Sequence, residues 1–231
     1  MRVGKLAALL IVVAALMVLQ ASASEVSTWI GGTAQPMPHL NYYGPGPQVF
    51  GTDNVITWSS TNATNHGGSV FGFGNVNDYN NYYNFGGNGF WELEPPMAAV
   101  NDSHWGYGVV DTMTFAFATP VWSVGGFLNY VPPPESDTIT TIAVYDSHSN
   151  LIESYGLTFT TGGGWNTGAW IGFLESSPDI SYFTLTDNYI GITDLTTDFT
   201  EPIQTPEPSS LLLLGSGLAG ILGTVRRKLA K

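Results

Sequence analysis

Residues 111–130 read DTMTFAFATPVWSVGGFLNY, and this stretch points to β-structure. In its first part, Met113, Phe115 and Phe117 alternate with threonine and alanine, which is the period-two pattern of a strand with one buried face. The second part, residues 121–130, is another apolar run of strand length. No amphipathic helical segment separates the two runs, so the stretch predicts two consecutive strands.

The chain continues in the same way up to residue 199. Further strands are predicted at residues 139–146, 151–161, 168–175, 180–187 and 192–199. The segments between the strands are rich in Pro, Gly, Asn, Asp and Ser, which is the composition of turns and loops. Seven short strands at this spacing predict an all-β fold, an antiparallel β-sandwich.

Residues 24–107 are less regular. Strands are predicted at residues 55–60, 69–74 and 89–94. Residues 75–89 are rich in Asn, Tyr and Gly, and they predict a long surface loop or a flexible insert. We expect strands from this half to complete the sheets of one sandwich. A small separate N-terminal subdomain is the alternative.

Charge is distributed very unevenly along the chain. All 18 Asp and Glu residues lie between residues 24 and 208, a stretch without Lys or Arg. Because contacts to nucleic-acid phosphates need basic side chains, this distribution excludes DNA and RNA as partners. Mutual repulsion is expected to raise the pKa of the carboxyl groups, so that stability increases as the pH falls. The basic residues lie at the two ends: Arg2, Lys5, Arg226, Arg227, Lys228 and Lys231.

The sequence offers few residues for metal or thiol chemistry. It contains no Cys, which excludes disulfides, a thiol nucleophile and Cys-ligated metal sites. Hard cations bind clustered oxygen ligands, so calcium is the candidate cofactor. The segment TDNYIGITD and the residues after it supply its predicted ligands, Asp187, Asn188, Asp194 and Asp198.

Residues 1–23 have the pattern of a secretory signal peptide. A basic start precedes an apolar stretch of 14 residues, residues 6–19. Ala21 and Ala23 form an A-x-A cleavage signal before Ser24. The pattern predicts export through the Sec translocon and cleavage by signal peptidase. An uncleaved N-terminal anchor is the alternative.

An apolar segment near the C-terminus precedes a basic cluster. Residues 209–225 contain no charged side chain, and at about 1.5 Å per residue a helix of this length crosses a locally thinned bilayer. Arg226, Arg227 and Lys228 follow directly. The positive-inside rule places them in the cytoplasm, where they act as a membrane stop signal.

Pro206, Glu207 and Pro208 stand immediately before this predicted transmembrane helix. The prolines favour an extended backbone, the form that proteases and transpeptidases bind in their clefts. With the apolar helix and the basic end, they resemble the PEP-CTERM sorting signal of bacterial exported proteins. The resemblance implies processing by exosortase, a membrane transpeptidase, in a cell that makes exopolysaccharide. A plain C-terminal membrane anchor is the alternative.

Residues 111–199 also resemble the jelly-roll domains that often precede this signal. The similarity lies in VGGF at residues 124–127 and in the closing segment, residues 192–199. It implies a sandwich of jelly-roll type, a fold shared with many carbohydrate-binding modules. The expected domains are a signal peptide at 1–23, a β-sandwich at 24–204 and a sorting signal at 205–231.

Exposed aromatic side chains that stack on sugar rings are the candidate glycan-binding residues. Trp105, Trp165 and Trp170 lie in or beside Gly-rich loops, although packing within the core is the alternative role for each of them. Glu92 and Glu94 are a pair of acids of the kind that glycosidases use, but sequence spacing does not show whether two carboxylates face each other across a sugar. No residue is predicted to be catalytic.

These features predict an exported protein that is held transiently in the inner membrane and then reaches the cell surface or the extracellular matrix. Its sandwich is expected to be non-catalytic and to bind an exopolysaccharide or calcium. A secreted polysaccharide-active enzyme is the first alternative. A purely structural or adhesive matrix protein is the second.

Overall fold

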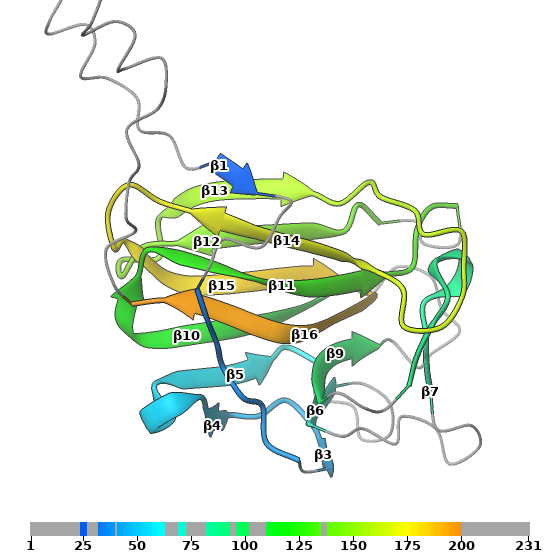
Figure 1. Ribbon diagram of the computed structural model, residues 1–231, viewed down its shortest axis with the longest axis horizontal. Helices are drawn as coiled ribbons and strands as arrows, with labels where there is room; N and C mark the ends of the chain where they lie inside the picture. Colours follow the sequence, from blue (N-terminus) through cyan, green and yellow to red (C-terminus); the bar gives the residue numbers. More distant parts are fainter. Residues whose placement is uncertain are drawn as a thin grey trace, which may run out of the picture. The chain divides into compact units, whose positions relative to one another are not determined.

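The computed structural model describes residues 24–26, 32–39, 41–62, 69–72, 82–92, 96–101, 110–134 and 138–199 of the 231-residue chain. These residues form two large antiparallel sheets and a separate two-stranded hairpin (Figure 1). The predicted all-β sandwich is therefore confirmed. The predicted signal peptide and sorting signal lie outside the described residues, and Ser24, the first residue after the predicted cleavage site, is the first described residue. Within the described ranges, no helical segment reaches the length and apolar character that a bilayer crossing needs.

The larger sheet, sheet A, contains eight strands from both halves of the chain. Seven of them lie side by side in the order β1 (Ser24–Val26), β14 (Ala169–Leu174), β11 (Ser123–Tyr130), β16 (Tyr189–Asp198), β9 (Met97–Asn101), β6 (Ser69–Gly72) and β3 (Asn41–Tyr43). The eighth, β2 (Thr33–Ala34), pairs with the later part of β16.

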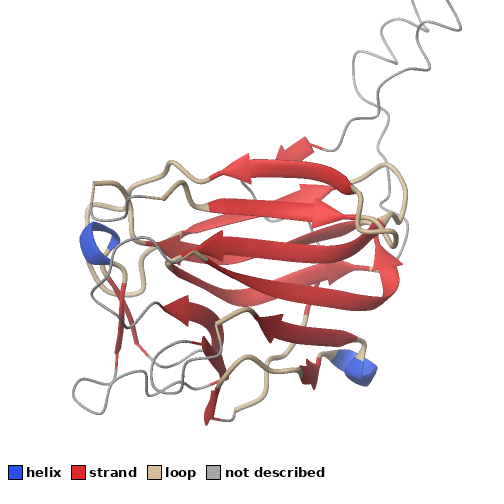
Figure 2. Cartoon of the chain, turned by 180° about the vertical axis from the view of Figure 1, so that it is seen from behind, coloured by secondary structure: helices blue, strands red, loops and turns tan. Residues whose placement is uncertain are grey.

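The second sheet, sheet B, has the strand order β13 (Leu151–Gly156), β12 (Thr141–Tyr145), β15 (Ile180–Asp187), β10 (Asp111–Val121), β5 (Ile56–Ser60) and β4 (Gln48–Phe50). The hairpin consists of β7 (Tyr82–Asn84) and β8 (Phe90–Glu92). The described chain has two short 3₁₀ turns, η1 (Thr52–Asn54) and η2 (Gly86–Asn88), and is otherwise strand and loop (Figure 2).

Strands β10 to β16 correspond to the seven strands predicted between residues 111 and 199. In β10, Met113 and Phe115 are fully buried and Phe117 is nearly so, as their alternation predicts. Strands of the first half complete both sheets, as expected: β5 pairs with β10, and β9 pairs with β16. Part of the predicted long loop forms β7, and the sequence pattern did not indicate β9.

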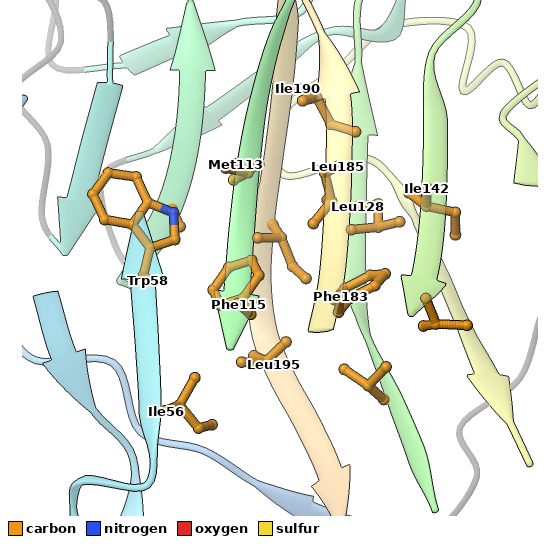
Figure 3. Packing of buried hydrophobic residues seen from close by; sticks show 14 of the residues in the cluster. Ile56, Trp58, Met113, Phe115, Leu128, Ile142, Phe183, Leu185, Ile190 and Leu195 are labelled. Carbon is orange, nitrogen blue, oxygen red and sulfur yellow. The ribbon is translucent and has the colours of Figure 1, made fainter. Parts of the chain in front are cut away.

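The main hydrophobic core lies between the two sheets (Figure 3). It contains side chains from both, among them Phe115 and Phe183 from sheet B and Leu128 and Ile192 from sheet A. The aromatic rings make specific contacts; Trp58 stacks on Phe71 with ring centroids 5.0 Å apart. Burying each large apolar side chain contributes about 1.5–3 kcal/mol, so this layer supplies most of the stability.

A second, smaller hydrophobic cluster covers the opposite face of sheet A, which we call its outer face. The β7–β8 hairpin supplies its aromatic side chains, Tyr83, Phe85 and Trp91. The aliphatic side chains are Val70, Met97 and Ala99 of the sheet and Val131, which directly follows β11. Gly191 on β16 makes room for these rings. A Cβ atom at that position would lie 2.9 Å from the ring of Phe85 and 3.1 Å from that of Trp91.

Asn88, which is completely buried, ties the hairpin to the sandwich. Its Nδ2 donates to the Tyr130 carbonyl at 3.1 Å, and its Oδ1 accepts from the Thr161 amide at 3.0 Å. Its own carbonyl accepts from the hydroxyls of Thr161 and Thr167 at 2.8 and 2.6 Å. A buried amide with all these partners fixes the hairpin in one position.

Candidate functional site

A surface pocket lies where the hairpin meets the outer face of sheet A. Its volume is about 240 Å³, and its lining comes from four separate segments of the chain. The lining combines aromatic, amide, hydroxyl and carboxylate groups: Trp91, Glu92, Phe127, Asn166, Thr193 and Asp194.

The apolar part of the pocket is an aromatic pair. Trp91 on β8 and Phe127 on β11 stack with ring centroids 5.9 Å apart and an interplanar angle of 21°. Trp91 is 4% exposed, and its Nε1 donates to the Thr167 carbonyl at 2.6 Å. Packing and hydrogen bonding thus hold both rings in place before any ligand arrives.

The aromatic surface continues from Phe127 to the next strand. Trp170 on β14 lies directly opposite Phe127 on β11, so both half-buried side chains are on the outer face of sheet A. Trp170 lies over Gly125, where a Cβ atom would be 2.5 Å from its ring. We call Trp91, Phe127 and Trp170 the outer aromatic strip.

One wall of the pocket is the loop between β13 and β14, which docks on β8. The Phe90 amide donates to the Gly164 carbonyl at 2.8 Å, and the Asn166 amide donates to the Phe90 carbonyl at 2.6 Å. The Glu92 amide donates to Asn166 Oδ1 at 3.0 Å. Gly164 has a φ of +121°, a conformation that favours glycine. These contacts fix the position of Asn166 and of the backbone that carries Glu92.

The opposite wall is a β-bulge in β16. Thr193 pairs with Phe127 and Thr196 pairs with Gly125, so two residues, Asp194 and Leu195, stand opposite a single residue of β11. Asp194 has a φ of +51° and is exposed, whereas the Leu195 side chain is buried in the core. The bulge therefore aims a carboxylate into the pocket without disturbing the inner face of the strand.

The structure separates the four predicted calcium ligands. Asp187 is completely buried and accepts hydrogen bonds from the hydroxyls of Thr138, at 2.7 Å, and Thr140. Asn188 is also buried, at the crossover from β15 to β16. Asp194 lies on the outer face, and Asp198 is at the far end of β16. Asp187 and Asn188 are neighbours, but Asp194 and Asp198 lie progressively further along β16, so the four side chains do not gather at one point.

No group of three or more His, Cys, Asp or Glu side chains in the described part of the chain is placed to hold a metal ion together. Calcium binding therefore stays a sequence-based prediction for this chain. Of the four residues, only Asp194 belongs to the pocket.

The predicted glycan-binding tryptophans have different environments. Trp165 is 57% exposed and lies against Phe90, with ring centroids 5.5 Å apart. Trp170 belongs to the outer aromatic strip. Trp105 lies outside the described residues, as do the predicted cleavage residues Ala21 and Ala23. The sorting residues Pro206, Glu207 and Pro208 and the stop-signal residues Arg226, Arg227 and Lys228 also lie outside them.

Glu92, one of the two predicted acids, lines the pocket, while Glu94 lies outside the described residues. The sequence analysis did not select Trp91, Phe127, Asn166 or Thr193. Two of them are direct neighbours of selected residues: Trp91 precedes Glu92, and Asn166 follows Trp165. Their convergence on one pocket depends on long-range pairing.

Burial, rather than mutual repulsion, is the first cause of the raised carboxyl pKa values. Burial raises the pKa of Glu175 from 4.5 to about 7, and repulsion by Glu153 and Asp179 adds to this effect. Burial likewise raises the pKa of Asp187, although its hydrogen bonds oppose the shift. The pKa values of these two carboxyl groups are therefore raised, as expected, but burial and not repulsion is the leading cause.

Two solved structures resemble part of the fold. The lectin domain of lectinolysin complexed with Lewis B antigen is 9% identical; the match covers 45% of this chain and 72% of that chain, with a TM-score of 0.30. A histidine mutant of the lectin binding domain of lectinolysin complexed with Lewis b is 8% identical, over 44% and 69%, with a TM-score of 0.28. A comparison with curated proteins found no match.

A family model matches the C-terminal segment. Residues 204–228 match the PEP-CTERM protein-sorting motif. The matched range contains the Pro206-Glu207-Pro208 motif, the apolar segment and the start of the basic cluster, which are the features on which the resemblance was based. The chain therefore carries a PEP-CTERM protein-sorting motif.

Proposed function

We propose that this chain is an exosortase substrate that is exported and delivered to the cell surface or the exopolysaccharide matrix. The sorting motif at residues 204–228 supports this proposal. On this proposal, the Sec translocon exports the chain, signal peptidase cleaves it before Ser24, and the apolar tail holds it transiently in the inner membrane. Exosortase then acts at Pro206, Glu207 and Pro208.

We further propose that the sandwich binds a glycan in the pocket on the outer face of sheet A, without catalysis. The observation that carries this proposal is the pocket lining, in which a fixed aromatic pair adjoins amide, hydroxyl and carboxylate groups. The C–H faces of a pyranose ring pack on aromatic rings, and its hydroxyls need hydrogen-bonding groups at the edge. Ligand sites generally combine an apolar surface with a few polar groups in this way.

The order of the strands supports a jelly-roll type of sandwich. Four adjacent strands of sheet A run β14-β11-β16-β9, and four adjacent strands of sheet B run β13-β12-β15-β10. Except for the β12–β13 hairpin, each connection from β9 to β16 passes from one sheet to the other. This is the pattern of two Greek keys wrapped into a double sheet.

A glycan-binding measurement on the full-length chain in mild detergent tests the proposal. Isothermal titration with exopolysaccharide fragments from the native host should show binding. Trp170→Ala should weaken it by about threefold to tenfold, because the variant shortens the outer aromatic strip. Trp122→Ala is the matched control, since Trp122 lies at the β10–β11 crossover and belongs neither to the pocket lining nor to the outer aromatic strip. No binding by the unmodified chain would leave the structural or adhesive role.

A polysaccharide-active enzyme is the second candidate, because Glu92 and Asp194 line one pocket from different elements. Glycosidases use two carboxylates that flank the scissile bond. Both side chains here are exposed, however, whereas a catalytic acid is usually kept in an apolar setting. Release of reducing ends from the bound fragments would favour the enzyme, and binding without release would favour the non-catalytic site.

A further inference from the structure

The pocket contains two carboxylates that come from different layers of the molecule. Glu92 belongs to the hairpin and Asp194 to the bulge of β16 in sheet A. Both are exposed, so a ligand reaches them without burying an unpaired charge. A carboxylate in such a setting forms its strongest hydrogen bonds with a cationic donor.

The rest of the exported sequence contains no Lys or Arg side chain that would neutralise these carboxylates. Between residues 24 and 208 there are 18 Asp and Glu residues and no Lys or Arg. An acidic glycan would therefore meet repulsion from the whole surface and find no Lys or Arg side chain to bind. A positively charged ligand would be attracted by the same field before it reaches the pocket.

The aromatic pair favours the same sign of charge. The faces of Trp and Phe rings carry a negative electrostatic potential, and they attract an ammonium group that lies over them. Phe127 is half-buried and lies beside the two carboxylates, and Trp91, which is 4% exposed, stacks on Phe127 and holds it in place. An aromatic surface next to acidic side chains is suited to an organic ammonium group, whose apolar carbons contact the rings.

Polar groups at the wall of the pocket fit the remainder of a sugar. Because Asn166 Oδ1 accepts from the Glu92 amide, the Asn166 side chain presents its NH₂ group as a hydrogen-bond donor. A sugar hydroxyl can accept from such a group. Asp194 is held at a φ of +51°, a conformation that costs a non-glycine residue some free energy and that Asp tolerates better than most residues.

We propose that this pocket recognises a glycan with free amino groups, in which the protonated amine of a 2-amino-2-deoxy sugar lies between Glu92 and Asp194 and the sugar ring packs on the outer aromatic strip. This proposal rests on the proposed glycan-binding function and adds the class of sugar. Trp170 and Asp194 lie two strands apart, about 10 Å, which leaves room for more than one sugar ring.

Three oligosaccharides of matched length serve as probes: one of glucosamine, one of N-acetylglucosamine and one of galacturonic acid. Each is titrated into the full-length chain in mild detergent, at low and at high salt. The glucosamine oligomer should bind at least about tenfold more tightly than the N-acetylated one at low salt, and salt should reduce this difference by screening.

Two variants locate the effect. Asp194→Asn and Glu92→Gln should each weaken binding of the glucosamine oligomer by about fivefold, since each removes one charge-assisted contact. Their affinity for the N-acetylated oligomer should stay unchanged. Asp53→Asn is the matched control, because Asp53 is also an exposed Asp with a positive φ, +63°, and does not line the pocket.

The possible failures are distinguishable. Equal affinity for the two amino-sugar oligomers would overturn the proposed class of ligand, and so would equal loss of affinity in the Asp53 variant, which would indicate diffuse attraction to the acidic surface. Tighter binding of the galacturonic acid oligomer than of the glucosamine oligomer would also overturn it. In each of these cases glycan binding itself stands. If the chain binds no oligomer or host fragment, the proposed function fails as well.

Discussion

The two faces of sheet A have different roles, although the same strands form both. On the inner face, Val124, Leu128 and Ile192 are fully buried in the main core. On the outer face, Phe127 and Thr193 alternate with them and line the pocket. Because successive side chains of a strand point to opposite faces, stability and recognition can be separated within single strands. Substitutions on the two faces should therefore have different consequences.

The largest expected effect comes from the inner face. Phe173 on β14 is fully buried and packs edge to face on Phe183 of sheet B, with ring centroids 6.2 Å apart. Phe173→Ala should lower the free energy of unfolding by about 3–5 kcal/mol, since it leaves a cavity in a closely packed core. Denaturant unfolding followed by tryptophan fluorescence measures this.

Glycan affinity is the control for the inner-face variant. Under conditions where Phe173→Ala stays folded, its affinity for glycan should equal that of the unmodified chain. A loss of affinity as large as that of Trp170→Ala, without unfolding, would mean that the inner face shapes the pocket. It would remove the separation of roles between the two faces.

The next effect concerns the layer that covers the outer face. Asn88→Ala removes the side-chain bonds to the Tyr130 carbonyl and the Thr161 amide and leaves these groups without their partner. We expect a loss of about 2 kcal/mol, together with loosening of the hairpin and of the loop that docks on it. Hydrogen exchange of the Phe90 amide, which donates to the Gly164 carbonyl, should accelerate. Unchanged exchange would show that the aromatic cluster alone holds the hairpin.

The inner-face pattern explains how far the fold could be predicted. Strands β10 to β16 were recognisable because each has apolar residues at alternate positions or a short apolar run. Strand β9 has no such alternation, because Ala98 packs in the main core while Ala99 packs under the hairpin, so both faces are buried. The strand predicted at residues 89–94 corresponds to β8, whereas the Tyr- and Asn-rich segment that forms β7 indicated a long loop or a flexible insert. This segment forms a strand because the Tyr83 ring packs against the outer face of sheet A.

The candidate site was less predictable than the fold. Asp194 was selected as a calcium ligand together with Asp187, because the two are close in sequence. The structure places Asp187 inside the sandwich and Asp194 in the pocket, since the chain crosses between sheets at Asn188 and a bulge turns Asp194 outward. Neither the crossover nor the bulge has a local sequence signal. Phe127 and Trp91 meet only through tertiary packing.

Glu175 tests how well the fold tolerates a buried charge at the end of β14. It follows β14, is 7% exposed, and its Oε1 has no hydrogen-bond partner among the described residues. Its pKa is raised by burial from 4.5 to about 7. A raised pKa in the folded state means that stability is fully present below pH 4.5 and is lost as the pH rises through about 7.

We therefore expect Glu175→Gln to be more stable than the unmodified chain at pH 8 by about 1–2 kcal/mol, less than the full pKa shift implies because solvent is near. At pH 4 the difference should be small, since the carboxyl group is then protonated in both folded and unfolded states. Thermal unfolding at the two pH values measures this. The same stability difference at both pH values would show that folding leaves the pKa of Glu175 unchanged.

The smallest expected effect on stability concerns Asp194, where the outer face carries strain. Asp194→Gly should raise the free energy of unfolding by about 0.5 kcal/mol, because glycine adopts a φ of +51° without the steric cost of a side chain, partly offset by its greater freedom when unfolded. The same variant should bind the glucosamine oligomer more weakly by about fivefold, since the carboxylate is gone. Denaturant unfolding and titration measure the two quantities on one protein.

Asp53→Gly is the matched variant for this last test, because it relieves a positive φ of +63° at an exposed Asp outside the pocket. It should gain a similar amount of stability and keep full affinity. If Asp194→Gly gained stability and also kept full affinity, the carboxylate at the bulge would have no role in binding. If it lost stability, the bulge would depend on the Asp194 side chain. Only the first result would contradict the separation of roles between the two faces, because the second concerns stability and not binding.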